Sequence, residues 1–170
     1  MKTKLRTDSA LASAELNVSL EPTQSIWKLF ILALGFLMAT LDVTIINVAI
    51  PEVRQSLSIN LSQATWVVDG YILTFAAFLL ISGSLANRYG AKNIYVSGLT
   101  VFVLASVLCA QASSGNMLII SRLIQGVGAA LFMPSSLSLL AHSYTDEKQR
   151  AKMFGIWAAI VSIASGIGPF

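Results

Sequence analysis

The stretch GSLANRYGAKN, residues 83–93, decides the fold of this chain. It lies between two long apolar segments, near residues 66–86 and 94–112, and it carries the cations Arg88 and Lys92. Apolar segments of this length with almost no charge are typical of transmembrane helices. Short basic loops beside such helices stay on the cytoplasmic side of the membrane, and Gly90 can adopt the positive φ of a tight reversal. The stretch therefore predicts a cytoplasmic turn between two membrane spans.

The composition of the whole chain agrees with a membrane protein. Hydrophobic residues make up 55% of the chain and charged residues 11%, whereas soluble domains carry about 25% charged residues. The cations gather in the N-terminal segment and in two links, which argues against a nucleic-acid binder. We predict an all-α, multi-pass transmembrane helical bundle with spans at about residues 29–50, 66–86, 94–112, 117–140 and 153–170.

The charge distribution predicts the orientation of these spans. Four cations lie in the N-terminal segment, two in residues 83–93 and three in residues 141–152, against Arg54 alone in the predicted outer links. This bias places the N-terminus and both basic links in the cytoplasm. We expect residues 1–25 to form a disordered cytoplasmic tail, followed by a partial N-terminal transmembrane bundle at residues 26–170. The first apolar segment is too long for a signal peptide, whose apolar region has about 7–15 residues.

The first predicted span contains an acidic residue, Asp42. It shares one helical face with small and apolar side chains, those of Gly35, Ala39, Ile46 and Ala49. Small residues let another helix approach closely, so this face should point into the bundle. If Pro51 ends the helix, Asp42 lies roughly 12 Å below the outer end. An ionisable group at that depth suggests a function, although a purely structural pair with an arginine is the alternative.

Two further charged residues lie within predicted spans. Arg122 lies roughly 8 Å inside the outer end of the fourth span, where it could be buried or could extend to the membrane surface. Asp69 lies about one turn inside the second span, where a hydrated carboxylate is as good an interpretation as a transport role. An arginine favours the charged form of a neighbouring acid, and burial disfavours it. We therefore take Asp42, Arg122 and Asp69 as candidates for proton coupling.

Four segments resemble motifs of major facilitator superfamily transporters. Residues 83–93 match the pattern G-x-L-x-x-R-x-G-x-K of the loop between the second and third spans, although Asn87 replaces the usual aspartate and Ala91 a common basic residue. LDVTIINVAIP, residues 41–51, resembles the end of the first span in drug:proton antiporters. RLIQGVGAA, residues 122–130, resembles the fourth-span motif. Gly168-Pro169 resembles the end of the fifth-span antiporter motif, with Ala164 in place of one glycine.

The resemblance covers residues 27–170 and implies the N-terminal part of a drug:proton antiporter with fourteen spans. It implies a gating loop with the residues Gly83, Asn87, Arg88, Gly90 and Lys92. It also implies a helix-packing motif with the residues Gln125, Gly126, Gly155, Gly168 and Pro169. The implied function is the export of a small amphipathic compound in exchange for a proton, across a bacterial plasma membrane and together with a missing C-terminal half. A metabolite or sugar carrier of the same fold and a non-transporting membrane fragment remain alternatives.

Other classes of function find little support in the sequence. There is no P-loop, no nucleophile–base pair and no metal-ligand spacing, and Cys109 and His142 are the only residues of their kinds. We therefore expect no enzyme activity, no cofactor and no metal site. Five spans cannot complete the two six-helix bundles of this fold, so we also expect the chain on its own to move no substrate.

Overall fold

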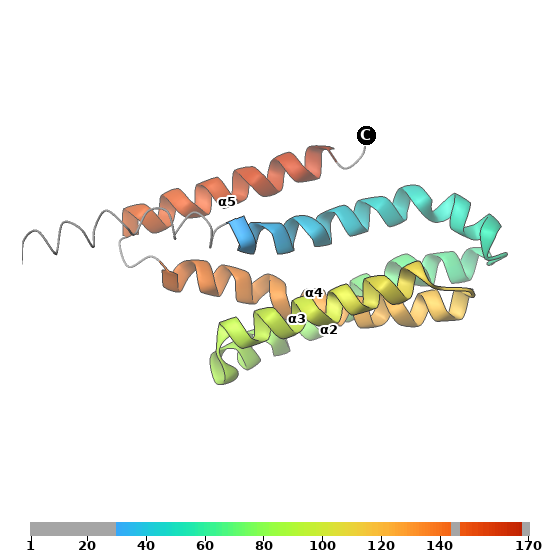
Figure 1. Ribbon diagram of the computed structural model, residues 1–170, viewed down its shortest axis with the longest axis horizontal. Helices are drawn as coiled ribbons and strands as arrows, with labels where there is room; N and C mark the ends of the chain where they lie inside the picture. Colours follow the sequence, from blue (N-terminus) through green and yellow to red (C-terminus); the bar gives the residue numbers. More distant parts are fainter. Residues whose placement is uncertain (1–29, 144–146, 168–170) are drawn as a thin grey trace, which may run out of the picture.

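The computed structural model describes residues 30–143 and 147–167, and these residues form helices joined by short links. A first helix, Phe30–Ser56, precedes the others. They are α2, Leu61–Tyr89, α3, Ala91–Ala110, α4, Gly115–Ser143, and α5, Glu147–Ile167. All of these except α5 are long and apolar enough to cross a membrane. Figure 1 shows the arrangement, and the prediction of an all-α helical bundle is confirmed. The predicted tail at residues 1–25 and the pair Gly168-Pro169 lie outside the described residues.

The first helix ends later than predicted. It passes through Pro51 and continues to Ser56, because a proline removes only one backbone donor and the bonds on either side persist. The end of the helix is a Schellman motif at Ser58, whose φ of 50° is left-handed. The N–H of Ser58 donates to the carbonyl of Gln55 at 3.4 Å, and the N–H of Ile59 donates to that of Arg54 at 3.2 Å. The expected stop at Pro51 is therefore wrong.

The second helix begins with a capping box at Asn60. The Asn60 side chain accepts a hydrogen bond from the N–H of Gln63 at 2.8 Å, and the Gln63 side chain accepts one from the N–H of Asn60 at 3.2 Å. The two bonds satisfy donors that a helix start leaves free. Ser62 and Thr65 are residue types that also cap helices, but both lie inside α2.

Replacing Asn60 by alanine should lower the stability of the protein by about 1 kcal/mol, because the first turn of α2 loses its side-chain acceptor. The measurement is the thermal unfolding midpoint of the purified protein in detergent. Ser62→Ala is the matched control, since Ser62 is exposed and lies two residues further on. An equal loss in both variants would contradict the assignment of the cap to Asn60.

The turn between α2 and α3 is a single residue, Gly90, with φ 88°. The predicted positive φ is confirmed, but the observed link is far shorter than residues 87–93, which lie between the two predicted spans. Arg88 therefore lies in the last turn of α2 and Lys92 in the first turn of α3. A helix C-terminus favours a cation, so Arg88 suits this position.

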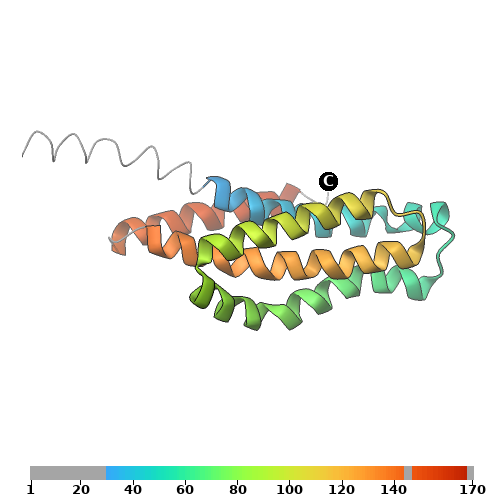
Figure 2. The same cartoon turned by 60° about the horizontal axis from the view of Figure 1, so that its bottom comes forward.

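The centre of the described bundle is α4, which packs against α2 on one side and α3 on the other. A Cβ on Gly126 would collide with the carbonyl oxygen of Tyr71 and with Thr74 of α2. A Cβ on Gly128 would lie 2.7 Å from the backbone nitrogen of Phe102 and 2.9 Å from the carbonyl oxygen of Gly98, both on α3. Small residues thus permit close backbone contact on both sides of α4. Figure 2 shows α2, α3 and α4 side by side.

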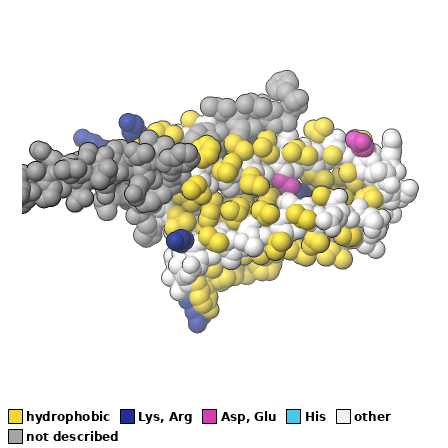
Figure 3. Space-filling model, in the orientation of Figure 1, with side chains coloured by type: hydrophobic (Ala, Val, Ile, Leu, Met, Phe, Trp, Pro, Cys, Tyr) yellow, Lys and Arg dark blue, Asp and Glu magenta, His cyan; other side chains and the backbone are white. Residues whose placement is uncertain are grey.

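The outer surface of the bundle is apolar. Leu80 is 86% exposed and Val48 69% exposed, which would be costly in water and is expected against lipid tails. Figure 3 shows hydrophobic side chains over most of the visible face, while most of the visible cations lie toward the end that carries the α2–α3 turn. The described chain is therefore a multi-pass membrane protein.

The last helix, α5, starts before the fifth predicted span, at Glu147, and its described part ends at Ile167. Its described contacts are with the first helix and with α4. Trp157 packs edge-on against Phe36, with 4.9 Å between ring centroids, and Met153 and Phe154 join the same apolar cluster. Much of the link predicted at residues 141–152 is thus helical.

Candidate functional site: a buried ion pair

The site is built around Arg122, which lies on α4 and is only 2% exposed. Its Nη1 forms an ion pair with Oδ2 of Asp42 on the first helix at 2.5 Å. The same nitrogen donates to Oε1 of Gln125 at 2.9 Å, and Nε donates to the carbonyl of Val67 on α2 at 3.1 Å. The guanidinium is therefore held by three elements at once and does not extend to the membrane surface.

Gln125 completes the ring of hydrogen bonds around the carboxylate. It is fully buried, and its Nε2 donates to Oδ1 of Asp42 at 2.7 Å. The same amide nitrogen donates to Oγ of Ser106 on α3 at 2.8 Å, and the thiol of Cys109 lies 3.5 Å from Oε1. Each oxygen of Asp42 thus has its own donor, and the network includes side chains from the first helix, α3 and α4.

The second helix contributes an aromatic ring to the network. Cζ of Arg122 lies 4.4 Å from the centroid of the Tyr71 ring, and Tyr71 is 4% exposed. A cation above an aromatic face gains about 2 kcal/mol where water is excluded. Tyr71 follows Val67 by one helical turn, so the same stretch of α2 supplies both the ring and the carbonyl that accepts from Nε of Arg122.

The arrangement sets a carboxyl group, which can exist in a charged or a protonated form, against a buried guanidinium. A buried arginine favours a charged partner, while burial favours a neutral carboxyl group. Asp42 is the less buried partner, because its side chain is 23% exposed whereas that of Arg122 is 2% exposed. The side chain of Gln125 can hydrogen-bond to Asp42 as a carboxylate or as a protonated carboxyl group, since an amide both donates and accepts hydrogen bonds. Among the described residues, no three metal-ligating side chains come together.

A groove of about 490 Å³ lies beside the network, between the first helix, α2 and α4. Its lining is mainly apolar and comprises Phe36, Ala39, Thr40, Val43, Thr44, Tyr71, Ile72, Phe75 and Met133. The hydroxyls of Thr40 and Thr44 donate back to carbonyls of their own helix, at 2.8 and 3.0 Å. Their oxygens can still accept a hydrogen bond. Small ligands bind in mostly apolar hollows with a few polar groups, and this groove has that character.

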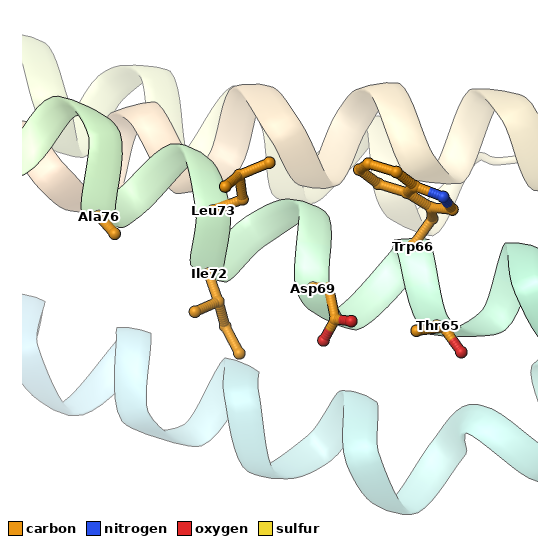
Figure 4. Close-up of a pocket in the computed structure, with 6 residues that line it drawn as sticks. All are labelled: Thr65, Trp66, Asp69, Ile72, Leu73 and Ala76. Carbon is orange, nitrogen blue, oxygen red and sulfur yellow. The ribbon is translucent and has the colours of Figure 1, made fainter.

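The third charged candidate, Asp69, does not join the ion pair. It is exposed and lies in a separate hollow of about 530 Å³ lined by Thr65, Trp66, Asp69, Ile72, Leu73 and Ala76, all of α2. Figure 4 shows Asp69 pointing to the side of α2 that faces the first helix. Of the three predicted charges, the structure thus brings together two.

The other predicted site residues are placed as follows. Gly83 and Gly155 have open space around them, with nothing within 4 Å of an added Cβ, whereas Gly126 lies in a close helix contact. Asn87, Arg88 and Lys92 are exposed beside Gly90, and Cζ of Arg88 lies 5.4 Å from the Tyr89 ring. Gating by residues 83–93 and helix packing at Gly155 stay predictions.

Three members of the network were absent from the sequence-based candidates, namely Tyr71, Ser106 and Cys109. Ser106 had a usable signal: it is the one hydroxyl in the apolar stretch 101–110, and such polar side chains often bond to a neighbouring helix. Tyr71 had no comparable signal, because a tyrosine in a span packs equally well without a cation.

Comparison with known proteins points to one family. The family model described as Major Facilitator Superfamily matches residues 32–170. The chain is 67% identical over 142 residues to the methylenomycin A resistance protein of Bacillus subtilis (strain 168), covering 84% of this chain and 30% of that protein. It is 56% identical over 142 residues to the methylenomycin A resistance protein of Streptomyces coelicolor, with the same coverage. It is also 39% identical over 143 residues to a putative multidrug resistance protein MdtD of Yersinia pestis, again covering 84% of this chain and 30% of that protein. The chain thus spans about 30% of the length of these relatives.

Proposed function

The chain belongs to the Major Facilitator Superfamily, and we propose that it forms the N-terminal part of a proton-coupled exporter of small amphipathic compounds. The rest of the exporter would be a further set of membrane spans, which would pack against the spans of this chain. Two helical bundles would then rock around a site at their interface, in the manner of this class of transporter.

The observation that carries the proposal is the Asp42–Arg122 ion pair beside the groove. Charged side chains inside a membrane bundle are costly and are kept where a transport step uses them. Protonation of Asp42 would cancel its charge and weaken its hold on Arg122, so the first helix would be freer to move relative to α4. Release of the proton would restore the pair. Asp69 is proposed to have a secondary role, because it lies in a separate hollow.

The names of the relatives support the class of substrate. The Bacillus subtilis and Streptomyces coelicolor proteins are named for resistance to methylenomycin A, and the Yersinia pestis protein for putative multidrug resistance. The apolar groove, with aromatic faces and two hydroxyl oxygens, fits a small amphipathic molecule. We propose that the chain serves such export in a bacterial plasma membrane, with residues 83–93 as part of the cytoplasmic gate.

The test is a chimera in which the matching 142 residues of the Bacillus subtilis relative are replaced by those of this chain. We expect the chimera to protect a susceptible bacterium against methylenomycin A about as well as the intact relative does. Dissipation of the proton gradient should abolish this protection. A chimera that reaches the membrane at the same level but gives no protection would contradict the proposal.

The orientation can be tested by labelling single cysteines in the chimera, with Cys109 replaced by serine. We expect Ser113→Cys, in the link between α3 and α4, to react with a membrane-impermeant maleimide in intact cells. Asn87→Cys, beside the α2–α3 turn, should react only after the cells are permeabilised, because the cations near it stay in the cytoplasm. Both positions are exposed. Labelling of Asn87→Cys in intact cells would overturn the proposed orientation.

A further inference from the structure

Among the described residues, Tyr71 both contacts Arg122 and lines the groove. Its ring lies 4.4 Å from Cζ of Arg122, and its side chain forms part of the groove wall. Within that wall the ring of Phe75 stacks on Tyr71, with centroids 6.4 Å apart and an angle of 4° between the planes. None of the described residues that line the groove is charged. The Tyr71 ring therefore lies between an apolar binding space and a buried cation.

The backbone of α2 is fixed at this level, so motion of Tyr71 must be motion of its side chain. Gly126 of α4 approaches the Tyr71 carbonyl so closely that no Cβ would fit. Nε of Arg122 donates to the carbonyl of Val67, one turn earlier on the same helix. The ring thus covers a guanidinium whose other contacts are with Asp42 and Gln125.

We propose that Tyr71 is a positioning residue that transmits occupancy of the groove to the Asp42–Arg122 pair. The inference rests on the proposed transport function. A ligand in the groove would pack against the ring and hold it over the guanidinium, which keeps Arg122 on Asp42. The pair favours the carboxylate, so a proton on Asp42 leaves to water when the ligand enters. When the groove is empty, the ring is freer to turn, the pair loosens and Asp42 takes up a proton.

Among the described residues, Asp42 supplies the carboxyl group of this network. Besides Arg122, the described titratable side chains at the network are Tyr71 on α2 and Cys109 on α3. Phenols and thiols ordinarily ionise at about pH 10 and 8.5, so neither Tyr71 nor Cys109 is expected to change charge in a transport profile measured between pH 5 and 8.

The experiment uses Cys109 as a reporter, because its thiol contacts Gln125 and it is the only cysteine of the chain. In the chimera, with the cysteines outside the exchanged segment replaced by serine, the rate of alkylation by N-ethylmaleimide is measured at one pH without ligand. We expect Tyr71→Leu and Tyr71→Met to react at least threefold faster than the parent, since Arg122 and Gln125 are no longer confined. Tyr71→Phe keeps the ring and should restore the parent rate.

Phe75→Leu is the matched control, because it removes a ring from the same groove wall, whereas it is the Tyr71 ring that lies over the guanidinium of Arg122. It should leave Cys109 reactivity near the parent value. Equal acceleration by Phe75→Leu and Tyr71→Leu, or a Tyr71→Phe variant that behaves like Tyr71→Leu, would overturn the inference. So would an unchanged rate in both ring-less variants.

A second measurement separates this inference from the proposed function. The pH profile of methylenomycin A efflux should shift in Tyr71→Leu by at least half a pH unit, whereas Phe75→Leu should lower efflux evenly across the pH range. Parallel profiles for the two variants would contradict a coupling role for Tyr71. A chimera with no efflux at any pH contradicts the transport function, while the alkylation rates still decide whether Tyr71 positions Arg122.

Discussion

Replacing Asp42 by asparagine should abolish proton-driven efflux by the chimera. Asparagine keeps the size of the side chain and can still accept a hydrogen bond from Arg122, but it cannot bind and release a proton. Energy from a pH gradient would then have no route to the transport step. The measurement is efflux from proteoliposomes with an imposed pH gradient, at matched protein level. We expect a loss of at least tenfold, to the background of empty vesicles.

Exchange of substrate without a gradient distinguishes loss of coupling from loss of structure. Asp42→Asn should retain this exchange, since a neutral side chain imitates the protonated carboxyl group. Arg122→Ala should lose both activities, because it leaves Asp42 without its ion-pair partner, and breaking a buried pair costs about 3–5 kcal/mol. Asp69→Asn should have the milder effect, as Asp69 is exposed and outside the network. Gradient-driven efflux by Asp42→Asn at the parent rate would remove Asp42 from the mechanism.

The helices could be predicted from the sequence because the bilayer demands long apolar segments. Their ends could not be predicted equally well. Pro51 and Ser62 are residues that often mark helix ends, but the observed ends depend on hydrogen bonds at Ser58 and Asn60. Those bonds form only when the backbone has turned, and hydropathy carries no information on them.

The candidate site was predictable in part. Depth along the helices put Asp42, Asp69 and Arg122 at similar levels, and the faces of the first and fourth spans pointed inward. Depth does not specify which side chains meet, so Asp69 could not be separated from the pair by sequence alone. Gln125 was assigned to helix packing, whereas its amide bonds to Asp42, Arg122 and Ser106. The role of a buried amide such as that of Gln125 depends on its hydrogen-bond partners on other helices, and the sequence does not show which residues these are.

The same limit applies to the glycines. The fourth-span segment contains both Gly126 and Gly128, and only the first was assigned to packing. The structure gives each a different neighbour, α2 for Gly126 and α3 for Gly128. Gly155 looks similar in sequence, yet no atom lies within 4 Å of a Cβ added there. The contact between α3 and α4 is therefore the better place to test what holds the network together.

Substituting Gly128 by alanine should destabilise the protein by about 1–3 kcal/mol, the usual cost of overpacking a filled interior. The new Cβ would lie 2.7 Å from the nitrogen and 3.0 Å from the Cα of Phe102, and 2.9 Å from the carbonyl oxygen of Gly98. All three atoms are backbone, so no side-chain rotation can relieve the collision and α3 must move away from α4. For a protein of this size the unfolding midpoint in detergent should fall by roughly 2–12 °C.

The matched controls are Gly83→Ala in α2 and Gly155→Ala in α5, where the added methyl group meets open space. Alanine favours a helix over glycine by about 1 kcal/mol, so these variants should melt at or above the parent midpoint. Gly128→Ala should also accelerate alkylation of Cys109, because Ser106 lies one turn beyond Phe102 and would move away from Gln125 with α3. A midpoint for Gly128→Ala at or above that of the parent would show that α3 and α4 are not in close contact at this glycine. In that case the link from Gln125 to Ser106 would have to form across a wider gap, and α3 would lose its part in holding the ion pair.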